Sequence, residues 1–564
     1  MILPFTSPPP LSHPRINRPF FQLMQLRRAA LLATAAFALI LASGCGKKDS
    51  ASSRSADGSA PKILRVGNGA EPTDLDPHVV TGVGEHKIIT SLIEGLVTYS
   101  KDGDTAPGVA ERWDISEDGL TYTFHLRENA KWSNGDPVTA HDFVGSFKRI
   151  LTPTLGAEYS YKLFHLVGAE EFNLGKLTDF SQVGAKALDD RTLQLTLKHR
   201  TPFLLESLKH YAWFPVHLPT VQKFDGLTRK GSLWTRAGNF VGNGPFNLVD
   251  WRPNQKITVT RAPTYWDAAN VSLDGIEFFA IESSDTEERE FRTGRLDVAY
   301  SLPLSKIETY RRNHPDTYRA TPYYGTYFYR LNVTQKPLDD KRVRRALALA
   351  IDRESIIKNI LRDAGQTPAF NFTPPSDKFT SEARIAGDLA EAKRLLAEAG
   401  YPEGRGMPRV EILFNTLESH RVIAEAIQQM WRTRLGVNAG ILNQEWKVYL
   451  DSQQTLNYQV ARAGWIGDYN DPHTFLDMWI TGGGNNQTGW SHADYDRLLR
   501  TALESKTEAD RMAVYQQLET ILADEVPVIP IYFYTRIYAI SPKVQNWITT
   551  PLDNRAWKWI DLAN

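Results

Sequence analysis

The 564-residue chain contains one cysteine, Cys45, and no excess of either charge. A single thiol excludes an intramolecular disulfide and any zinc site built from several cysteines. Because 65 Lys and Arg residues balance 65 Asp and Glu residues, no global field attracts nucleic acid or another polyanion. A charged ligand must therefore be recognised by a local arrangement of side chains.

The motifs of common catalytic chemistries are also missing. The sequence contains no G-x-S-x-G, no H-E-x-x-H, no Walker P-loop and no G-x-G-x-x-G. Ser355 and Lys358 fit S-x-x-K, but the companion motifs S-D-N and K-T-G are absent. DYND at 468–471 could begin a calcium loop, yet Pro472 and His473 interrupt its pattern of oxygen ligands. We therefore expect a protein that is not an enzyme and that holds no metal ion and no cofactor.

Hydrophobic residues make up 42% of the chain and aromatic residues 11%. This composition supports sizeable cores and excludes disorder over most of the length. The length exceeds what one core can organise, so we expect two to four domains. Aromatic side chains in this number fill cores or line a ligand cleft, and composition alone does not separate the two.

The position of Cys45 indicates export. Residues 24–45, MQLRRAALLATAAFALILASGC, combine a basic start, an apolar run and small residues before the cysteine. The run is too short for a transmembrane helix and is typical of a signal peptide. Its end resembles a bacterial lipobox, although Ala42 stands where a large aliphatic residue is usual. We expect residues 1–45 to hold this signal, with Met24 as the true start and Cys45 lipidated.

Residues 46–62, GKKDSASSRSADGSAPK, are small and polar and predict a flexible tether. Acyl chains on Cys45 would hold the globular body at a membrane surface without a transmembrane helix. We therefore expect a periplasmic protein that is lipid-anchored to a membrane of the cell envelope. Residue 46 is glycine and not the acidic residue that retains lipoproteins at the inner membrane, so the sequence also agrees with anchoring at the outer membrane.

Strand-like and helix-like segments alternate irregularly after the tether, which indicates an α/β or α+β fold and no barrel. Short strands are predicted at 63–67, 120–127, 191–198, 256–262 and 275–281, and a strand pair at 527–540. Helical patterns cover 341–365, as one helix or a pair, and 388–400, 420–436 and 492–525.

The stretch GWIGDYNDPHTF (464–475) places Asp468 and Asp471 among aromatic residues. Carboxylates usually sit in water and such aromatics are usually buried. A cation ligand, a catalytic acid or a helix or turn cap would explain the pattern. Locally, a cap before residues 472–480 is favoured for Asp468, and Asp471 is expected to be a turn residue leading into Pro472.

Further stretches run in a constant order along the chain after the tether: EPTDLDPH (71–78), LIEGLVTY (92–99), the segment 107–149, VGNGPFNLVDW (241–251), YWDAANVSLDGIEF (265–278), RVRRALALAIDRESI (342–356), NQEWKVYLD (443–451) and VARAGWIGDYNDPHTFL (460–476). Together they resemble the extracytoplasmic solute-binding proteins of family 5, the peptide-binding proteins of ABC importers. The oligopeptide-binding members are the nearest in pattern.

The resemblance implies an α/β periplasmic-binding-protein-like clamshell of class II, the large peptide-binding type, with two lobes, a hinge and an extra third domain. Carried over, the boundaries give lobe I as residues 62–93, 219–323 and 536–564, the extra domain as 94–218, and lobe II as 324–535.

The implied function is to enclose an extended oligopeptide between the lobes and deliver it to an ABC permease and its ATPase. The protein is expected to be a monomer without nucleic-acid partners. Alternatives keep the fold and change the ligand to a dipeptide, a murein peptide, haem, an opine or a nickel complex. A sensory lipoprotein without transport, or a chaperone-like binder, is a further alternative.

In relatives, the peptide adds as a strand to the protein backbone. The aspartate that holds the peptide's ammonium matches Asp468. Cations for the carboxylate match Arg462, Arg362 and His420, at depths that would suit several peptide lengths. Backbone and wall positions carry over as Val83, Tyr159, Tyr323, Asn415, Trp446, Gly464 and Trp465.

Each of these residues also has an ordinary structural explanation. Arg362 and Arg462 could be solvated or salt-bridged, His420 could simply be a helix N-terminal residue, and the aromatic residues could pack in a core. The chain departs from its relatives at three positions. Gln453 replaces an arginine, which would weaken the binding of very short peptides. Gly325 and Ile466 stand where two relatives' cysteines form a disulfide across lobe II, so packing must replace that cross-link.

Overall fold

The computed structural model describes residues 60–563. The expected signal peptide, Cys45 and residues 46–59 of the tether lie outside this range. Residues Lys62–Asn564 form one compact unit. No helix within the described range is long and apolar enough to span a membrane.

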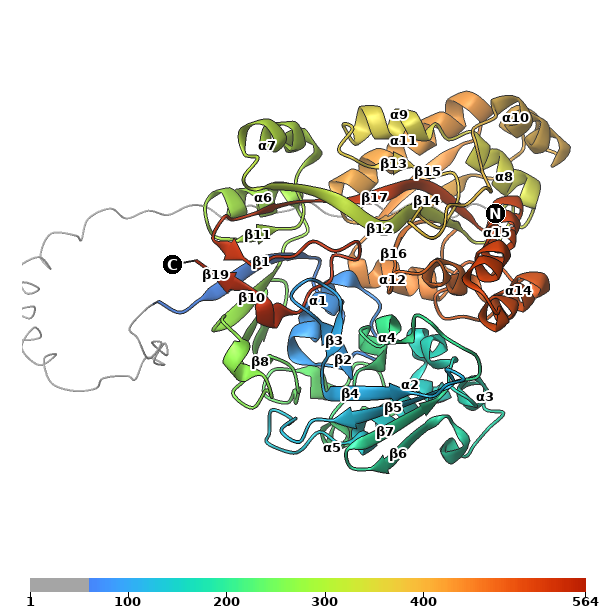
Figure 1. The fold of residues 1–564 in the computed structure, drawn as a ribbon. Coiled ribbons are helices and arrows are strands. Elements are labelled where there is room, and N and C mark those ends of the chain that lie inside the picture. The colour runs from blue at the N-terminus through green and yellow to red at the C-terminus, as the bar shows by residue number, and fades with distance from the viewer. Residues whose placement is uncertain (1–59, 564) are drawn as a thin grey trace, which may run out of the picture. The chain divides into compact units, whose positions relative to one another are not determined.

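A mixed sheet of 11 strands forms the framework (Figure 1). Its order is β15-β14-β16-β12-β17-β11-β1-β10-β9-β8, with β13 beside β17. The two longest strands, β12 (Tyr318–Leu331) and β17 (Val528–Ile540), are antiparallel and connect the two ends of the sheet. One end holds β1 (Ile63–Gly69), β8 (Phe246–Arg252), β9 (Lys256–Arg261), β10 (Gly275–Ala280) and β11 (Val298–Ala299); the other holds β13 (Thr367–Pro368), β14 (Val410–Asn415), β15 (Ala439–Gln444) and β16 (Val460–Ile466).

The long strands are rich in aromatic and β-branched residues, which favour extended backbone. The prediction of a strand pair at 527–540 is wrong: no turn residue interrupts the run, and it continues as the single strand β17. The ladder between β12 and β17 loses its regular register between Pro322 and Thr326. Pro322 has no N–H to donate to a ladder, and this irregularity lies at the expected boundary between the lobes.

Strand predictions at 63–67, 256–262 and 275–281 are confirmed as β1, β9 and β10. β1 lies parallel to β10 and to β11, and β9 pairs antiparallel with β10. The helices of this end of the sheet are α1 (Val83–Leu92), α6 (Ser284–Arg292) and α7 (Ile307–Asn313).

Helices cover the other end of the sheet where the sequence predicts them. The predicted segment 341–365 is divided into α8 (Lys341–Leu349), α9 (Arg353–Ser355) and a π-helical turn at Ile356–Ile360. Asp352 caps α9 by accepting from the N–H of Ser355, which separates it from α8. The remaining helices are α10 (Leu389–Glu398), α11 (Glu418–Leu435), α12 (Trp446–Gln454), α13 (His473–Leu476), α14 (Ala493–Glu504) and α15 (Glu508–Glu525).

A separate antiparallel sheet of four strands lies within residues 94–218, drawn in blue and cyan in Figure 1. Its order is β4-β5-β7-β6, and the strand predictions at 120–127 and 191–198 are confirmed as β5 and β7. Helix α2 (Ala140–Leu151) starts with a capping box between Thr139 and Asp142. The four strands of this sheet are β4 (Ala110–Ile115), β5 (Thr121–Leu126), β6 (Ala185–Asp189) and β7 (Thr192–Thr196), and β2 (Val97–Tyr99) pairs with β3 (Thr105–Pro107). The short helices are α3 (Ala169–Asn173), α4 (Leu204–Ser207) and α5 (Leu218–Lys223).

Two large hydrophobic cores hold these layers together. One contains Leu64 of β1, Phe124 of the small sheet and Leu518 of α15, so it joins parts that are far apart in the sequence. The second contains Ile412 of β14 and Ile427 of α11 and stays within residues 327–532.

Candidate functional site

A cavity of about 760 Å³ lies along β17, between the two ends of the long sheet. Its volume falls within the range of about 300–1,000 Å³ that is typical of ligand pockets. We call it the large compartment. It is lined by Val83, Ser284, Asp285, residues 300–305, Ile307, Tyr323, residues 359–362, Gln366, residues 417–420, Val422, Arg462, Ile466, Tyr532 and residues 534–537.

A second cavity of about 90 Å³ adjoins the first, and we call it the small compartment. The two share Val83, Tyr323 and Ile466 as lining residues, so they form one continuous trough. The remaining lining of the small compartment is Thr81, Gly82, His86, Tyr159, His210, Tyr211, Gly464, Trp465, Gly467, Asp468, Leu552 and Asn554.

Most of the residues proposed from the sequence meet at this trough. Val83 and Tyr323 line both compartments; Arg362, His420 and Arg462 line the large one; Tyr159, Gly464, Trp465 and Asp468 line the small one. Asn415 and Trp446 line neither. Asn415 lies behind Arg462 and accepts a hydrogen bond from it, and Trp446 stacks on Tyr449 with 5.5 Å between ring centroids. Gln453 is buried and accepts a hydrogen bond from Arg330.

Arg462 is the only charged residue of β16, VARAGWI. Its guanidinium donates to the Tyr534 hydroxyl at 2.8 Å and to Asn415 Oδ1 at 3.3 Å, and it lies 4.6 Å from the centre of the Tyr327 ring. No described carboxylate lies within 4.0 Å of it, and within residues 60–563 its Nε has no hydrogen-bond partner. An arginine held by neutral groups in a cleft is an uncompensated positive charge.

Arg536 is a second lining cation, which the sequence reasoning missed. It is the only charged residue in β17, so a single arginine in an apolar strand was the available signal. Its Nε lies 3.0 Å from Asp553, and Arg555 pairs with the same carboxylate. Because two guanidinium groups share one aspartate, this cluster retains a positive charge.

Arg362 and His420 also line the large compartment. Arg362 is exposed and has a φ of 60°, just beyond the π-helical turn that ends at Ile360. His420 is buried in the first turn of α11. Burial, followed by the charge of Arg462, lowers the pKa of His420 well below its usual range. His420 is therefore neutral at neutral pH and would meet a carboxylate as a hydrogen-bond donor.

Asp468 lies in the small compartment with its side chain 8% exposed. Its Oδ2 accepts from the Lys162 ammonium and from the Thr474 hydroxyl, the latter at 3.2 Å. Its Oδ1 lies 3.3 Å from Nε2 of His210. The other nitrogen of His210, Nδ1, accepts from the N–H of Ala212, so in the neutral ring Nε2 carries the proton and faces Asp468. Burial raises the pKa of Asp468, and the Lys162 ammonium opposes that rise.

Lys162 and His210 are the other site residues that the sequence reasoning missed. Lys162 is the only charged residue in YSYKLF (159–164), a run that otherwise predicts a buried segment. Its side chain is 1% exposed, and its ammonium lies among four aromatic rings: Tyr159 at 4.9 Å, Tyr161 at 5.2 Å, Tyr469 at 5.7 Å and Trp465 at 6.0 Å. Burying an ammonium in this way is costly unless a carboxylate partner lies beside it, and here that partner is Asp468.

Asp471 lies apart from the trough. Its Oδ1 accepts from the N–H of His473 at 3.0 Å, which fits the expected turn before α13. Its Oδ2 also lies 3.0 Å from Arg511 of α15, and both side chains are buried. Asp471 is thus a turn residue that also anchors α15.

The backbone of β16 has a free edge beside the trough. β14 pairs with β16 only at Val460 and Ala461, although β16 continues to Ile466. The carbonyl of Arg462 accepts from the Tyr449 hydroxyl, and beyond it none of the described strands pairs with this side of β16. Gly464 lies on this edge, where a Cβ would come within 2.5 Å of the Tyr534 hydroxyl. The free edge offers backbone groups to an extended ligand.

The positions of the missing disulfide lie directly opposite each other: Gly325 and Ile466 are partners in the ladder between β12 and β16. A Cβ on Gly325 would lie 2.4 Å from Cδ1 of Ile466, so the isoleucine side chain fills the space over the glycine. Packing therefore occupies the site of the cross-link, as the sequence led us to expect.

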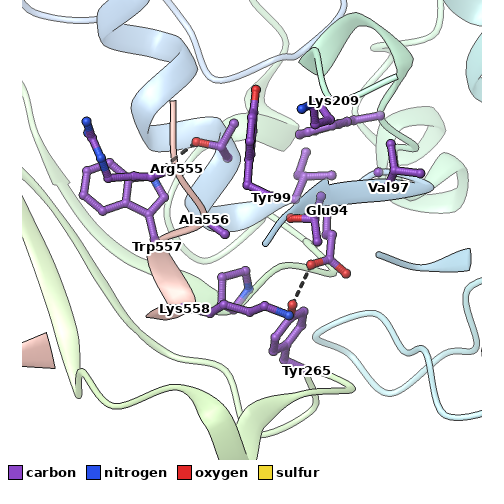
Figure 2. A pocket seen from close by; sticks show the side chains of 15 residues that line it. Glu94, Val97, Tyr99, Lys209, Tyr265, Arg555, Ala556, Trp557 and Lys558 are labelled. Carbon is purple, nitrogen blue, oxygen red and sulfur yellow. Dashed lines mark hydrogen bonds between the residues drawn. The ribbon is translucent and has the colours of Figure 1, made fainter. Parts of the chain in front are cut away.

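A cavity of about 20 Å³ near Glu94 is a weaker candidate (Figure 2). It holds little more than one water molecule. Glu94 accepts from the Tyr265 hydroxyl at 2.5 Å and from Nε1 of Trp266 at 2.6 Å, so its polar groups are paired internally. Within residues 60–563, no group of three or more His, Cys, Asp and Glu side chains is arranged to hold a metal ion.

Known proteins are similar to this chain in sequence and in fold. Residues 104–487 match the model described as bacterial extracellular solute-binding proteins, family 5 Middle. The periplasmic oligopeptide-binding protein OppA of Escherichia coli (strain K12) is 37% identical over 501 residues, which cover 86% of this chain and 90% of that protein. OppA of Haemophilus influenzae in complex with RPPGFSPFR has a TM-score of 0.85 and 32% identity, covering 90% of this chain and 100% of that one.

The murein tripeptide-binding protein MppA of Escherichia coli also has a TM-score of 0.85, at 34% identity, covering 90% of this chain and 99% of that one. Its unliganded open form, at the same identity, has a TM-score of only 0.60. Both structures are of MppA, so the difference between their TM-scores reflects a difference in conformation. The arrangement of this chain therefore differs from the open form. By sequence and by its two-lobe α/β fold, the chain belongs to the bacterial extracellular solute-binding proteins of family 5.

Proposed function

We propose that this protein binds an extended peptide in the trough between its lobes and delivers it to an ABC permease. The observation that carries the proposal is Arg462, a cleft arginine held only by neutral groups, beside the free edge of β16. A peptide supplies both a carboxylate and a row of backbone hydrogen-bonding groups. The printed names of the relatives, oligopeptide-binding and murein tripeptide-binding proteins, support the same ligand class.

The proposed binding mode adds the peptide as a strand. Residues 463–466 of β16 face it from lobe II and residues 81–83 from lobe I. Backbone hydrogen bonds give affinity that does not depend on the peptide's sequence. Side chains of the peptide then enter the large compartment, whose volume of about 760 Å³ leaves room for water around them.

The ends of the ligand are assigned by charge. The carboxylate is bound by Arg462, with Arg362 and His420 receiving the ends of longer peptides. The amino-terminal end enters the small compartment beside Asp468, with Tyr159, Trp465, Tyr323 and Val83 as walls. Asn415 holds Arg462 in position through its 3.3 Å hydrogen bond.

The domain boundaries taken from the resemblance are part of this proposal. The irregular ladder at 322–326 in β12 and its partner region of β17 would act as the hinge between lobe I and lobe II. Residues 94–218, with their own four-stranded sheet, would be the extra domain. Lipidation at Cys45, the monomeric state and the absence of catalysis are further expectations of the same proposal.

Mass spectrometry of the ligand retained by the purified protein tests the proposal directly. Peptides of two or more residues are the expected result. Retention of haem, a metal complex or another non-peptide ligand, together with no calorimetric binding of peptides, would refute it. A retained murein peptide would narrow the ligand class to that alternative, and loss of peptide uptake on deletion of adjacent permease genes would separate transport from sensing.

A further inference from the structure

We propose that the small compartment selects ligands whose end beside Asp468 carries no ammonium charge, such as N-acylated peptides, because Lys162 already supplies that charge from within the protein. This inference rests on the proposed function and specifies the ligand class of the same site. It is carried by the contacts of Asp468, the enclosure of Lys162 and the charges at the two ends of the trough.

The acceptor positions of Asp468 are occupied by the protein itself. Lys162 and Thr474 donate to Oδ2, and the protonated Nε2 of His210 faces Oδ1 at 3.3 Å. With 8% of its side chain exposed, this carboxylate has little surface left for a ligand. It is a satisfied and neutralised group.

Lys162 is not free to move aside for a ligand. Its side chain is 1% exposed, and four aromatic rings lie within 6.0 Å of its ammonium. Lys162 belongs to residues 94–218 and Asp468 to residues 324–535, so the pair joins two separate parts of the fold. Displacing the lysine would leave it buried without a counter-charge, which proteins avoid.

The rest of the small compartment adds no negative charge. Among residues 60–563, Asp468 is the only acidic residue that lines it. Burial lowers the pKa of His86 to about 4 and that of His210 well below its usual range, so both are neutral at neutral pH. A ligand ammonium here would be a second cation beside Lys162, with no unpaired carboxylate facing it.

The opposite end of the trough is basic around Arg462, Arg536 and Arg362; Asp285 and Glu418 also line the large compartment, and Glu418 pairs with Arg421. Charge complementarity therefore favours a ligand that is anionic at one end and uncharged at the other. An N-acylated peptide with a free carboxylate has this distribution. A free peptide is a zwitterion and matches only the basic end.

Competition between two peptide pools tests the inference. An equimolar mixture of random tetrapeptides and the same pool after N-acetylation is offered to the mature, ligand-stripped full chain, and retained peptides are quantified by mass spectrometry. We expect at least tenfold enrichment of acetylated over free-amine peptides. A ratio near or below one overturns the inference while leaving peptide binding intact, whereas retention of neither pool overturns the proposed function itself.

Two lysine variants separate the role of Lys162 from a general effect of charge. Lys162→Met is expected to shift the ratio at least tenfold towards free-amine peptides, because Asp468 then needs an external cation. Lys209→Met is the matched control: Lys209 is equally buried in residues 94–218 and pairs with Glu206 at 2.7 Å, but it lines the cavity of Figure 2. If the ratio of retained acetylated to free-amine peptides shifts equally in both variants, or does not shift in Lys162→Met, Lys162 does not set the selectivity. If Lys162→Met does not fold, the ratio measured with the wild type decides the inference.

Discussion

Replacing Arg462 by glutamine removes the cleft cation that no described carboxylate balances. The change keeps a polar side chain that can still reach Tyr534 or Asn415, so the wall of the large compartment is largely preserved. What is lost is one positive charge at the place where the proposed function puts the peptide's carboxylate. The fold should tolerate this change, because no internal ion pair is broken.

The magnitude follows from Coulomb's law in a partly shielded cleft. Two opposite charges about 4 Å apart, at an effective dielectric constant of about 20, attract by about 4 kcal/mol. Truncating one partner of such a pair typically costs about 2–5 kcal/mol. The dissociation constant of a peptide with a free carboxylate should therefore rise by a factor of about 30 or more in Arg462→Gln.

Calorimetry with matched peptides isolates this charge. Each peptide is measured with a free and with an amidated C-terminus, against the wild type and Arg462→Gln. Amidation should weaken binding to the wild type and change little in the variant, because the two modifications remove the same interaction. Arg434→Gln is the control, since Arg434 pairs with Asp352 at 3.0 Å and lines neither compartment.

Equal losses for free and amidated peptides in Arg462→Gln would show that Arg462 acts on the fold and not on the carboxylate. An unchanged dissociation constant for both would refute the assignment outright. The same series extended over peptide length tests Arg362 and His420, which should matter only for the longer peptides.

Three further predictions concern stability and access to the trough. Asp468→Asn leaves Lys162 buried without a counter-charge and should lower the free energy of unfolding by about 3–5 kcal/mol. Adding Lys162→Met should recover part of this loss, as measured by thermal denaturation. If the double variant recovers nothing, Lys162 and Asp468 do not form a direct ion pair. Burial lowers the pKa of His78 to about 4 and of His165 to about 3. Since the unfolded state takes up these protons near pH 6.5, the free energy of unfolding should fall as the pH drops from 6.5 to 4, by about 2 kcal/mol per histidine at pH 5. His78→Gln should make the free energy of unfolding depend less on pH. An unchanged pH dependence would exclude His78 as a source. Gly464 lines the small compartment, and a Cβ there would lie 2.5 Å from the Tyr534 hydroxyl. Gly464→Val should therefore displace Tyr534 from Arg462 and fill space that the ligand needs, so peptide affinity should fall; unchanged affinity would argue against a ligand beside Gly464.

Local patterns in the sequence predicted much of the fold. Alternating and apolar runs gave β1, β5, β7, β9 and β10, and periodic segments with caps gave α10, α11, α14 and α15. These elements form where the sequence predicts them because side-chain periodicity and capping act over a few residues. The uninterrupted strand β17 was predicted as a pair, because an apolar run does not say how many neighbouring strands it will cross.

The site was predicted only in part, because its members come from separate parts of the chain. The resemblance placed Arg462, Tyr323 and Asp468 at the cleft, and the structure brings them to one trough. A lone arginine in an apolar strand marks Arg462 and Arg536 alike, but no local pattern shows that the two strands bring both to one wall.

By itself, the sequence determined the class of fold, most secondary structure and the presence of a carboxylate among aromatics in GDYNDP. Only the tertiary structure decided what that carboxylate meets. Lys162 lies 306 residues before Asp468, and no local pattern encodes a contact at that separation. The helical turn Glu158–Leu163, which carries Lys162, and α13 share one hydrophobic core, and the burial that follows makes each charge depend on the other.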